Sequence, residues 1–272
     1  MKHLWNLKNH VAVITGGVGL LGVKHAEAIA EMGGIPILLD VNSLALDRVK
    51  QNLENKFGVD VLTYVCDITD KIQVTETLNN ILKHRTSIDI LINNAAINPK
   101  LELGKQHFLR FENFDLDQWI KEINVSLTGA FLCAQVFGNE MTKKKKGVII
   151  NVASDLGLIA PNQSLYREEG LADDKQPVKP VTYSVIKHGL IGLTRYLATY
   201  WADKGIRCNA LAPGGIFNGQ DEIFVKRIQE LIPMKRMATV DEYKASIVFL
   251  ASEASSYMTG SILVVDGGRT CW

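Results

Sequence analysis

The sequence VAVITGGVGLLG occupies residues 11–22. Its first five residues are an apolar run typical of a buried strand, and a helical pattern begins near Val23, directly after the glycines. Glycines in such a turn let the backbone approach a pyrophosphate, and the unpaired N–H groups at the start of the following helix can bind one. The same motif also occurs as a tight turn without a ligand, so its meaning depends on the rest of the chain.

Short apolar runs alternate with longer amphipathic stretches along the chain. Strands buried on both faces have such near-continuous apolar runs, and their alternation with helices is typical of βαβ units. We therefore expect an α/β protein: a single Rossmann-type domain over residues 1–272, with a doubly wound parallel sheet of about seven strands, helices on both faces and right-handed crossovers. The predicted strands are 11–15, 35–40, 61–66, 88–92, 148–152, 207–211 and 262–265.

Composition and charge argue against several classes of protein. The chain has 272 residues, of which 47% are hydrophobic, and a formal net charge of +1, which gives no reason to expect nucleic acid or a membrane as partner. The first residues lack a secretory signal and no apolar run has the length of a membrane span, so we expect a cytoplasmic protein. Four scattered cysteines, Cys66, Cys133, Cys208 and Cys271, indicate neither a metal site nor a disulfide framework.

A carboxylate ends the second predicted strand. Asp40 lies 18 residues after Gly22, where an acidic side chain can accept hydrogen bonds from the ribose hydroxyls of a dinucleotide. Its charge would repel a 2′-phosphate, and no Lys or Arg lies within residues 16–22 or in the three residues after Asp40. Asp40 could instead cap the next helix, although Asn42 or Ser43 can also supply that cap. The pattern favours NAD over NADP.

Tyr183 and Lys187 lie four residues apart at the start of a helical pattern. On a helix this spacing places the phenol and the ammonium group on one face, where the positive charge favours the phenolate and lowers the tyrosine pKa. Such a pair can move a proton to or from a substrate oxygen. The pattern alone is common by chance, so the surrounding motifs matter.

Further motifs follow the other predicted strands. They are Cys66-Asp67-Ile68, Asn93-Asn94-Ala95-Ala96, Asn151-Val152-Ala153-Ser154, Pro213-Gly214-Gly215 and Asp266-Gly267-Gly268, with Asn124-Val125 inside a helical pattern. In this order, and with the glycine turn, Tyr183 and Lys187, they resemble the classical short-chain dehydrogenase/reductase family from Val11 to Gly268.

The resemblance implies a role for each matching residue. Asn124 would hold a water in a proton relay, Ser154 would orient the substrate oxygen, Tyr183 would be the acid/base, and Lys187 would bind the nicotinamide ribose and tune Tyr183. The Asn124 side chain could instead form a hydrogen bond with the helix backbone, and the Ser154 side chain could cap a turn. Asn93 would lie along the cofactor. The residues expected to bind NAD are Gly16, Gly19, Leu20, Leu21, Gly22, Asp40, Val41, Asp67, Ile68, Asn94, Ala95, Ala96, Tyr183, Lys187, Pro213, Gly214, Ile216 and Asn218.

The distance along the chain between Ser154 and Tyr183, 29 residues, exceeds the usual family spacing. It predicts an inserted substrate loop around residues 155–181, whose middle would cover the substrate as a lid. Tyr166 lies nearer the usual spacing, but Gly170 and not a lysine follows four residues later. We therefore expect Tyr183 to be the catalyst, and the substrate to contact Ser154, Tyr166, Tyr183 and Gly215.

The expected function is NAD-dependent interconversion of a secondary alcohol and a ketone. Residues 159–166 and 214–220 are also similar to oxidoreductases of bacterial surface-sugar pathways, including the flagellin modification protein A group, which suggests a sugar phosphate or nucleotide sugar as substrate. The family resemblance further implies a homotetramer or homodimer. A 3-ketoacyl or steroid reductase, a non-catalytic dinucleotide-sensing module, and a structural partner in a sugar-pathway complex are the alternatives.

Overall fold

Seven parallel strands form one sheet in the computed structural model, which describes residues 1–97 and 109–272. Their order is β3-β2-β1-β4-β5-β6-β7, so the chain winds outward from β1 in one direction and from β4 in the other. The predicted doubly wound parallel sheet is confirmed. The strands are β1 Val11–Thr15, β2 Ile35–Asp40, β3 Leu62–Val65, β4 Ile90–Asn93, β5 Gly147–Val152, β6 Ile206–Pro213 and β7 Ile262–Val265.

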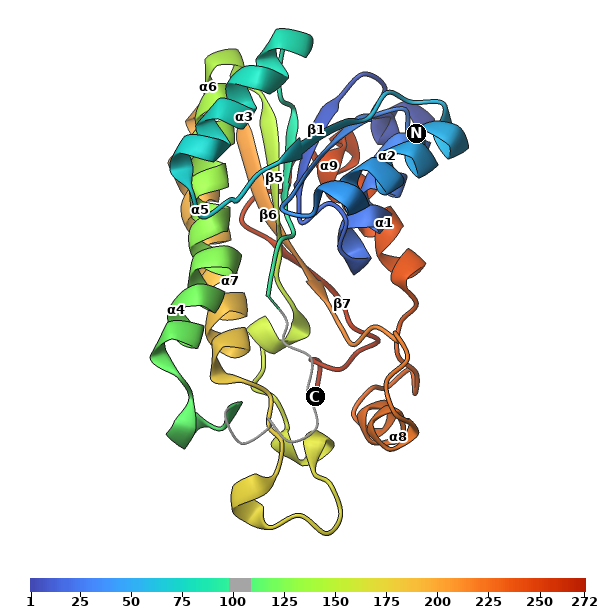
Figure 1. Cartoon of the computed structure of the whole chain (residues 1–272). Coiled ribbons are helices and arrows are strands. Elements are labelled where there is room, and N and C mark those ends of the chain that lie inside the picture. Colours follow the sequence, from blue (N-terminus) through green and yellow to red (C-terminus); the bar gives the residue numbers. More distant parts are fainter. Residues whose placement is uncertain (98–108) are drawn as a thin grey trace.

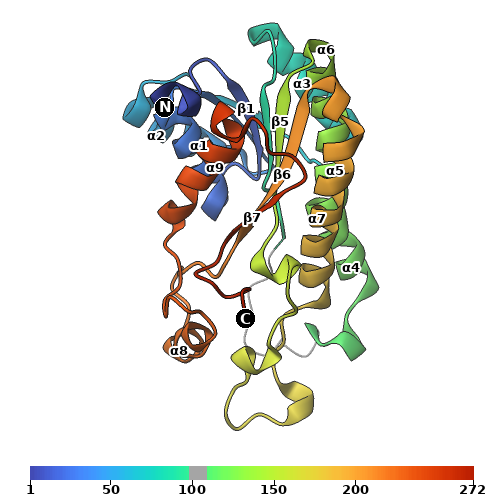
Figure 2. The same cartoon turned by 180° about the vertical axis from the view of Figure 1, so that it is seen from behind.

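Helices cover both faces of this sheet (Figures 1 and 2). One face carries α1 Leu20–Glu31, α2 Ser43–Phe57 and α9 Lys244–Ala251. The other carries α3 Lys71–His84, α4 Leu116–Ile123, α5 Gly129–Cys133, α6 Asn139–Lys144 and α7 Val181–Tyr200. The helix α8, Glu222–Glu230, lies apart from these layers. No helix of the described residues is long and apolar enough to cross a membrane.

The side chains of β1 alternate between two hydrophobic cores. Ala12 and Ile14 belong to the core under α1 and α9, and Val11 and Val13 belong to the core on the opposite face. All five residues of the strand are buried. The continuous apolar run in the sequence therefore results from cover on both faces of a parallel strand.

The helical segment from α4 to α6 contains two π-helical turns, Asn124–Thr128 and Ala134–Gly138. Such turns shift the face that a helix buries and are frequent near functional sites. Here the first of them follows α4, which packs beside α7.

Candidate active site

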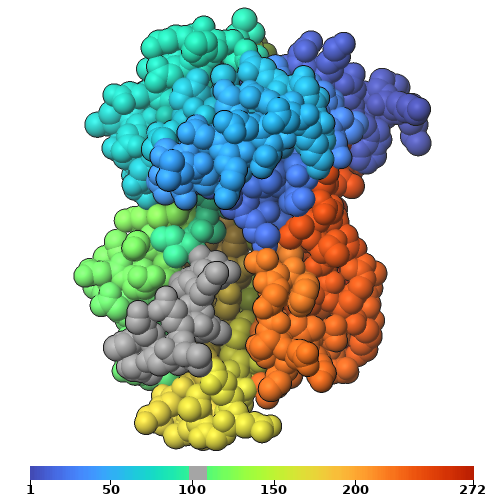
Figure 3. All heavy atoms as spheres, turned by 45° about the vertical axis from the view of Figure 1, so that its right-hand side comes forward, coloured from blue at the N-terminus to red at the C-terminus, as the bar shows by residue number. Residues whose placement is uncertain are grey.

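A cleft of about 630 Å³ lies where the carboxyl ends of the parallel strands meet. The space-filling view shows a hollow beside the orange segment that contains α8 (Figure 3). Most residues expected to bind the cofactor line the cleft, together with Ser154. They are Gly16, Gly19, Leu20, Leu21, Asp40, Val41, Asp67, Ile68, Asn94, Ala95, Ala96, Tyr183, Lys187, Pro213, Gly214 and Ile216.

The turn after β1 has a shape that only glycine allows at two positions. Gly16 has a φ of +60°, and a Cβ atom there would lie 2.8 Å from the Cα atom of Ala95. A Cβ atom on Gly22 would lie 2.1 Å from the carbonyl oxygen of Gly16. Gly22 does not line the cleft. Its lack of a side chain lets the first turn of α1 pack closely against the glycine turn. The N-terminus of α1 is thereby exposed to the cleft, as a bound pyrophosphate requires.

Asn94 holds this turn in place from the end of β4. Its side-chain Nδ2 donates to the carbonyl oxygens of Thr15 and Gly16, at 3.1 and 3.0 Å. The Thr15 hydroxyl in turn accepts the backbone N–H groups of Asn94 and Ala95. Asn94 thus lines the cleft and also fixes the glycine turn that forms the cleft wall.

The carboxylate of Asp40 lies in the cleft at the end of β2. It accepts the backbone N–H groups of Val18, at 3.4 Å, and Asn42, at 3.1 Å. The cap of α2 is supplied by Asn42, whose side chain accepts the N–H of Ala45. Asp40 is therefore not needed as a helix cap, and its carboxylate lines the part of the cleft next to the glycine turn.

Ser154, Tyr183 and Lys187 meet at the other end of the cleft. Ser154 follows β5, while Tyr183 and Lys187 lie in the first two turns of α7. The Nζ atom of Lys187 donates to the carbonyl oxygen of Val152 at 2.8 Å and lies 5.7 Å from the centroid of the Tyr183 ring. Because a Cβ atom on Gly157 would lie 2.8 Å from the carbonyl oxygen of Lys187, a glycine is needed for the turn after Ser154 to pack this closely on α7.

Burial shifts the titration of this cluster. It lowers the pKa of Lys187 to about 8, and the nearby charge of Lys179 acts in the same direction. Burial also raises the pKa of Tyr183 above its ordinary value, although the Ser154 hydroxyl opposes that shift. The expected lowering of the Tyr183 pKa is therefore not found in the protein alone, because removal of the phenol from water outweighs the favourable charges.

A second lysine lies against the tyrosine. The Nζ atom of Lys179 is 3.8 Å from the centroid of the Tyr183 ring, a distance at which a cation is attracted by the ring face. Burial lowers the pKa of Lys179 to about 8, while Asp155 and Glu122 oppose that shift. No local sequence pattern indicates this contact, because Lys179 belongs to the inserted loop.

A buried ion pair lies behind Ser154. The Ser154 hydroxyl donates to Oδ1 of Asp155 at 2.7 Å, and Oδ2 of Asp155 accepts a hydrogen bond from Arg269 at 2.7 Å. The side chains of Asp155 and Arg269 are only 4% and 6% exposed. The Nε atom of Arg269 is buried and has no hydrogen-bond partner. Neither residue was assigned to the site from sequence, although Arg269 directly follows the Asp266-Gly267-Gly268 motif.

The structure does not place Asn124 in this cluster. Asn124 is exposed, does not line the cleft, and its side-chain oxygen is 3.4 Å from the Thr128 hydroxyl. On the same π-helical turn the buried polar side chain is Ser126, whose hydroxyl oxygen accepts the N–H of Ile97 at 3.1 Å. Glu122, Ser126 and Ala130 form this inward face. Two of the three are polar, so the hydrophobic pattern of the sequence does not indicate it.

Four other expected site residues also lie outside the lining of the cleft. Asn218 is exposed on the loop after β6, and an added Cβ atom on Gly215 would lie 3.0 Å from Ile228 in α8. Tyr166 packs on Phe224 of α8, with ring centroids 5.6 Å apart. Asn93 is buried below the cleft, where its Nδ2 donates to Oδ1 of Asn151 at 2.8 Å. Asn93 therefore packs inside the sheet and does not line the cleft, where we expected it to lie along a cofactor.

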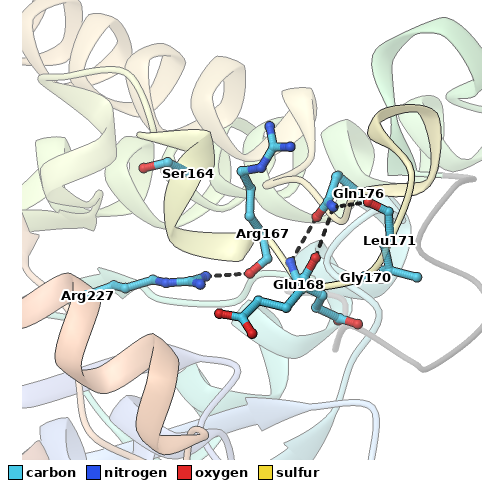
Figure 4. A pocket seen from close by; sticks show the side chains of 8 residues that line it. Ser164, Arg167, Glu168, Gly170, Leu171, Gln176 and Arg227 are labelled. Carbon is cyan, nitrogen blue, oxygen red and sulfur yellow. Dashed lines mark hydrogen bonds between the residues drawn. The ribbon is translucent and has the colours of Figure 1, made fainter.

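The inserted loop is held by two glutamines and by α8. Gln163 exchanges two hydrogen bonds with the backbone of Lys179, and the buried Gln176 bonds the backbone of Glu168 and Leu171. Figure 4 shows the Gln176 contacts beside a cavity of about 490 Å³, with Arg227 of α8 donating to the carbonyl oxygen of Arg167.

A small hydrophobic cluster joins this loop to α8. Leu165 of the loop packs with Ile228, Ile232 and Met237 in a core separate from those of the sheet, and Tyr166 packs against it. Burial raises the pKa of Tyr166 to about 12, and the charge of Arg269 opposes the shift. Because Tyr166 has no lysine one turn away and Tyr183 lies over Lys187, the geometry favours Tyr183 as the acid/base.

Comparison with known proteins identifies the family. Residues 10–167 match the family described as short chain dehydrogenase, and residues 172–270 match that described as enoyl-(acyl carrier protein) reductase. The chain is 33% identical over 275 residues to galactitol 2-dehydrogenase of Rhizobium johnstonii, which covers 98% of both chains. It is 30% identical over 262 residues to the post-translational flagellin modification protein A of Campylobacter coli, which covers 96% of this chain and 98% of that relative.

Solved structures agree with this assignment. A gluconate 5-dehydrogenase from Burkholderia cenocepacia, crystallised in complex with NADP and tartrate, superposes with a TM-score of 0.86 and 27% sequence identity. The match covers 100% of this chain and 99% of that one. The chain therefore belongs to the short-chain dehydrogenase/reductase family of oxidoreductases.

Proposed function

We propose that this protein is an NAD-dependent oxidoreductase that interconverts a secondary alcohol and a ketone on a sugar derivative. The observation that carries the proposal is the arrangement of one cleft. The glycine turn and Asp40 lie at one part of it, and Ser154, Tyr183 and Lys187 lie at another. A dinucleotide needs the first set of groups, and proton transfer at a substrate oxygen needs the second.

The residues of the cleft fit a nicotinamide dinucleotide. The backbone at Gly16 and Gly22 approaches its neighbours so closely that no side chain could be accommodated, and the N-terminus of α1 would hold the pyrophosphate. Asp40 would accept the hydroxyls of the adenosine ribose, and Asp67 and Ile68 line the same cleft. When bound, the nicotinamide supplies a hydride acceptor or donor.

The chain's own residues would move the proton. In alcohol oxidation the substrate O–H bond breaks and its proton passes to the Tyr183 oxygen, while the hydride leaves the carbon. The ammonium groups of Lys187 and Lys179 would favour the phenolate that accepts this proton. Ser154, which lines the cleft beside Tyr183, would hold the substrate oxygen.

The charges of the cleft favour NAD. Among the described residues that line it, the only Lys and Arg side chains are Lys121, on α4, and Lys187, beside Tyr183. Neither lysine lies in the loops that follow β1 and β2. Neither is therefore placed to neutralise a 2′-phosphate beside Asp40. The carboxylate would therefore bind ribose hydroxyls and repel the additional phosphate of NADP.

The substrate side is polar and cationic, which supports a hydroxyl-rich substrate with a phosphate or carboxylate group. Lys179, which lies on the Tyr183 ring, would supply the cation for such a group. The resemblance to enzymes named for a polyol and for flagellin modification supports a sugar derivative of a bacterial surface-glycan pathway.

The test is a screen of NAD and NADP reduction with polyols, sugar phosphates and nucleotide sugars, with a 3-hydroxyacyl thioester and a steroid alcohol as comparisons. The proposal expects turnover of a sugar derivative with NAD. Preferred turnover of the acyl or steroid alcohol would instead identify a reductase of that class. Tight NAD binding without turnover of any alcohol would indicate a dinucleotide sensor.

A further inference from the structure

We propose that Glu122 of α4 is a positioning residue for Tyr183, the proposed acid/base, because its buried carboxylate fixes the first turn of α7 through Thr182. This inference rests on the proposed oxidoreductase function and concerns a residue that does not line the cleft. It starts from the hydrogen bond that the Thr182 hydroxyl donates to Oε2 of Glu122.

Both partners of this hydrogen bond are buried. Glu122 is 1% exposed and Thr182 is 0% exposed, although the two residues lie 60 positions apart in the sequence. The other carboxylate oxygen of Glu122, Oε1, accepts the side-chain amide of Gln118, one turn earlier in α4. A buried carboxylate is costly unless hydrogen bonds satisfy it, so the two donors hold it in a defined place.

The first turn of α7 has no cap of its own. Its N-cap residue is Pro180, which offers no side-chain hydrogen bond, and no Asp or Glu lies in the first turn. Negative charge near a helix N-terminus is favourable because the unpaired N–H groups there carry partial positive charge. Glu122 therefore supplies, from a neighbouring helix, the carboxylate that α7 lacks.

Apolar side chains make the neighbouring contact between the two helical segments, which lie side by side (Figures 1 and 2). They are Ile123, Leu127, Ile186 and Leu190. Apolar packing is non-directional, whereas a hydrogen bond requires a defined distance and angle. The contact between Glu122 and Thr182 thus fixes the start of α7 relative to α4. It thereby fixes Tyr183, the residue that follows Thr182.

The charge of Glu122 also acts on Lys179, which lies on the face of the Tyr183 ring. Glu122 favours the charged form of Lys179 and opposes the lowering of its pKa by burial. Without that charge, Lys179 would lose its proton at a lower pH. Among the described residues, the charged and titratable groups that act on Lys179 or lie against it are Glu122, Asp155, Tyr183 and Lys187.

The experiment separates the hydrogen bond from the charge. Thr182→Val keeps the size of the side chain and removes the donor, and Thr182→Ser is its matched control because the hydroxyl remains. Glu122→Gln keeps an acceptor for Thr182 and removes the charge. The double variant Glu122→Leu with Thr182→Val removes both polar groups, so neither is left unpaired in the interior.

For each protein, the measurements are kcat and KM for the sugar derivative with the highest turnover in the screen above, the NAD dissociation constant and the melting temperature. At about pH 9.5, where Lys179 is neutral, Thr182→Val and the double variant should each lower kcat about tenfold. The two losses should be similar, because both variants remove the same contact. Thr182→Ser and Glu122→Gln should recover kcat to within about threefold of the wild type.

All four variants should bind NAD as the wild type does. A wild-type kcat in Thr182→Val with a lower melting temperature would overturn the inference and reduce the contact to a structural one. An equal loss of kcat in Thr182→Val and Thr182→Ser would also overturn it, because the hydroxyl would then not be responsible.

A second readout uses the charge at about pH 7, where Lys179 is charged in the wild type. Glu122→Gln should lower kcat/KM in the wild-type background and have no further effect in the Lys179→Met background. Equal losses in the two backgrounds would overturn the action of Glu122 through Lys179. Absence of turnover of any alcohol by the wild type would instead overturn the proposed function, and with it this inference.

Discussion

The Nζ atom of Lys179 lies 3.8 Å from the centroid of the Tyr183 ring, closer than the 5.7 Å of the Lys187 ammonium. The acid/base proposed for this enzyme is thus flanked by two lysines, one from its own helix and one from the inserted loop. Burial lowers the pKa of each lysine to about 8. Both are charged below that pH and lose their charge above it.

Lys179→Met should lower kcat/KM for alcohol oxidation below about pH 8, where Lys179 is charged, and have little effect above that pH. Removal of the cation from the ring face makes the phenolate less favourable only in the range where the cation is present. The measurement is kcat/KM between pH 6 and 10. Lys175→Met, on the same loop but exposed, is the control and should leave the profile unchanged. A profile of Lys179→Met that coincides with the wild type would exclude this role for Lys179.

Tyr183→Phe should abolish turnover and retain NAD binding. The ring remains, but the group that exchanges a proton is lost, which costs about 10²–10⁴-fold in kcat. Tyr166→Phe should keep substantial turnover, because Tyr166 packs on Phe224 and lies outside the cleft lining. Steady-state kinetics and NAD titration of both variants check this assignment, and an equal collapse of turnover in the two would contradict it.

The protein should bind NAD more tightly than NADP, and Asp40→Ala should bring the two dissociation constants closer together. The substitution removes the carboxylate that would repel a 2′-phosphate, so the NADP dissociation constant should fall while that of NAD rises. Asp67→Asn is the control: it lies in the same cleft, and it should leave the ratio of the two constants unchanged. A native enzyme that prefers NADP would show that Asp40 has been misinterpreted.

Gln176→Ala should raise the substrate KM or lower kcat with little effect on the NAD dissociation constant. The buried Gln176 side chain makes three hydrogen bonds that hold the inserted loop, so its loss would loosen the proposed lid without touching the glycine turn. Glu169→Ala, exposed on the same loop, is the control. Unchanged kcat/KM and substrate ranking in a folded Gln176→Ala variant would mean that the loop does not cover the substrate.

The protein should form a homodimer or homotetramer through a surface that includes its C-terminal segment. Trp272 is 74% exposed and Val264 of β7 is 38% exposed, and symmetric association would cover such apolar side chains. Sedimentation at micromolar concentration measures the mass of the assembly. Trp272→Ala should weaken the association, whereas Trp5→Ala, near the N-terminus, should not. A monomer in the wild type would refute this expectation.

The inner strands could be predicted from sequence because burial on both faces leaves a continuous apolar run, as β1 and β4 illustrate. The ends of those strands then indicated Asp40, Ser154 and the glycine turn. Asn124 could not be placed in the same way, because the π-helical turn sets which side chains point inward. The contacts of Arg269 with Asp155 and of Lys179 with Tyr183 join segments far apart in the sequence, and no local pattern encodes them.

The small hydrophobic core that joins Leu165 to α8 is separate from the two cores of the sheet, so we expect the two regions to respond differently to mutation. Substitutions in the two cores of the sheet are expected to shift the strands that carry both the proposed cofactor site and the proposed catalytic residues. Substitutions in the satellite core act on the inserted loop and α8, which pack on each other. Evolution could thus remodel what this enzyme recognises while the framework for hydride transfer stays constant.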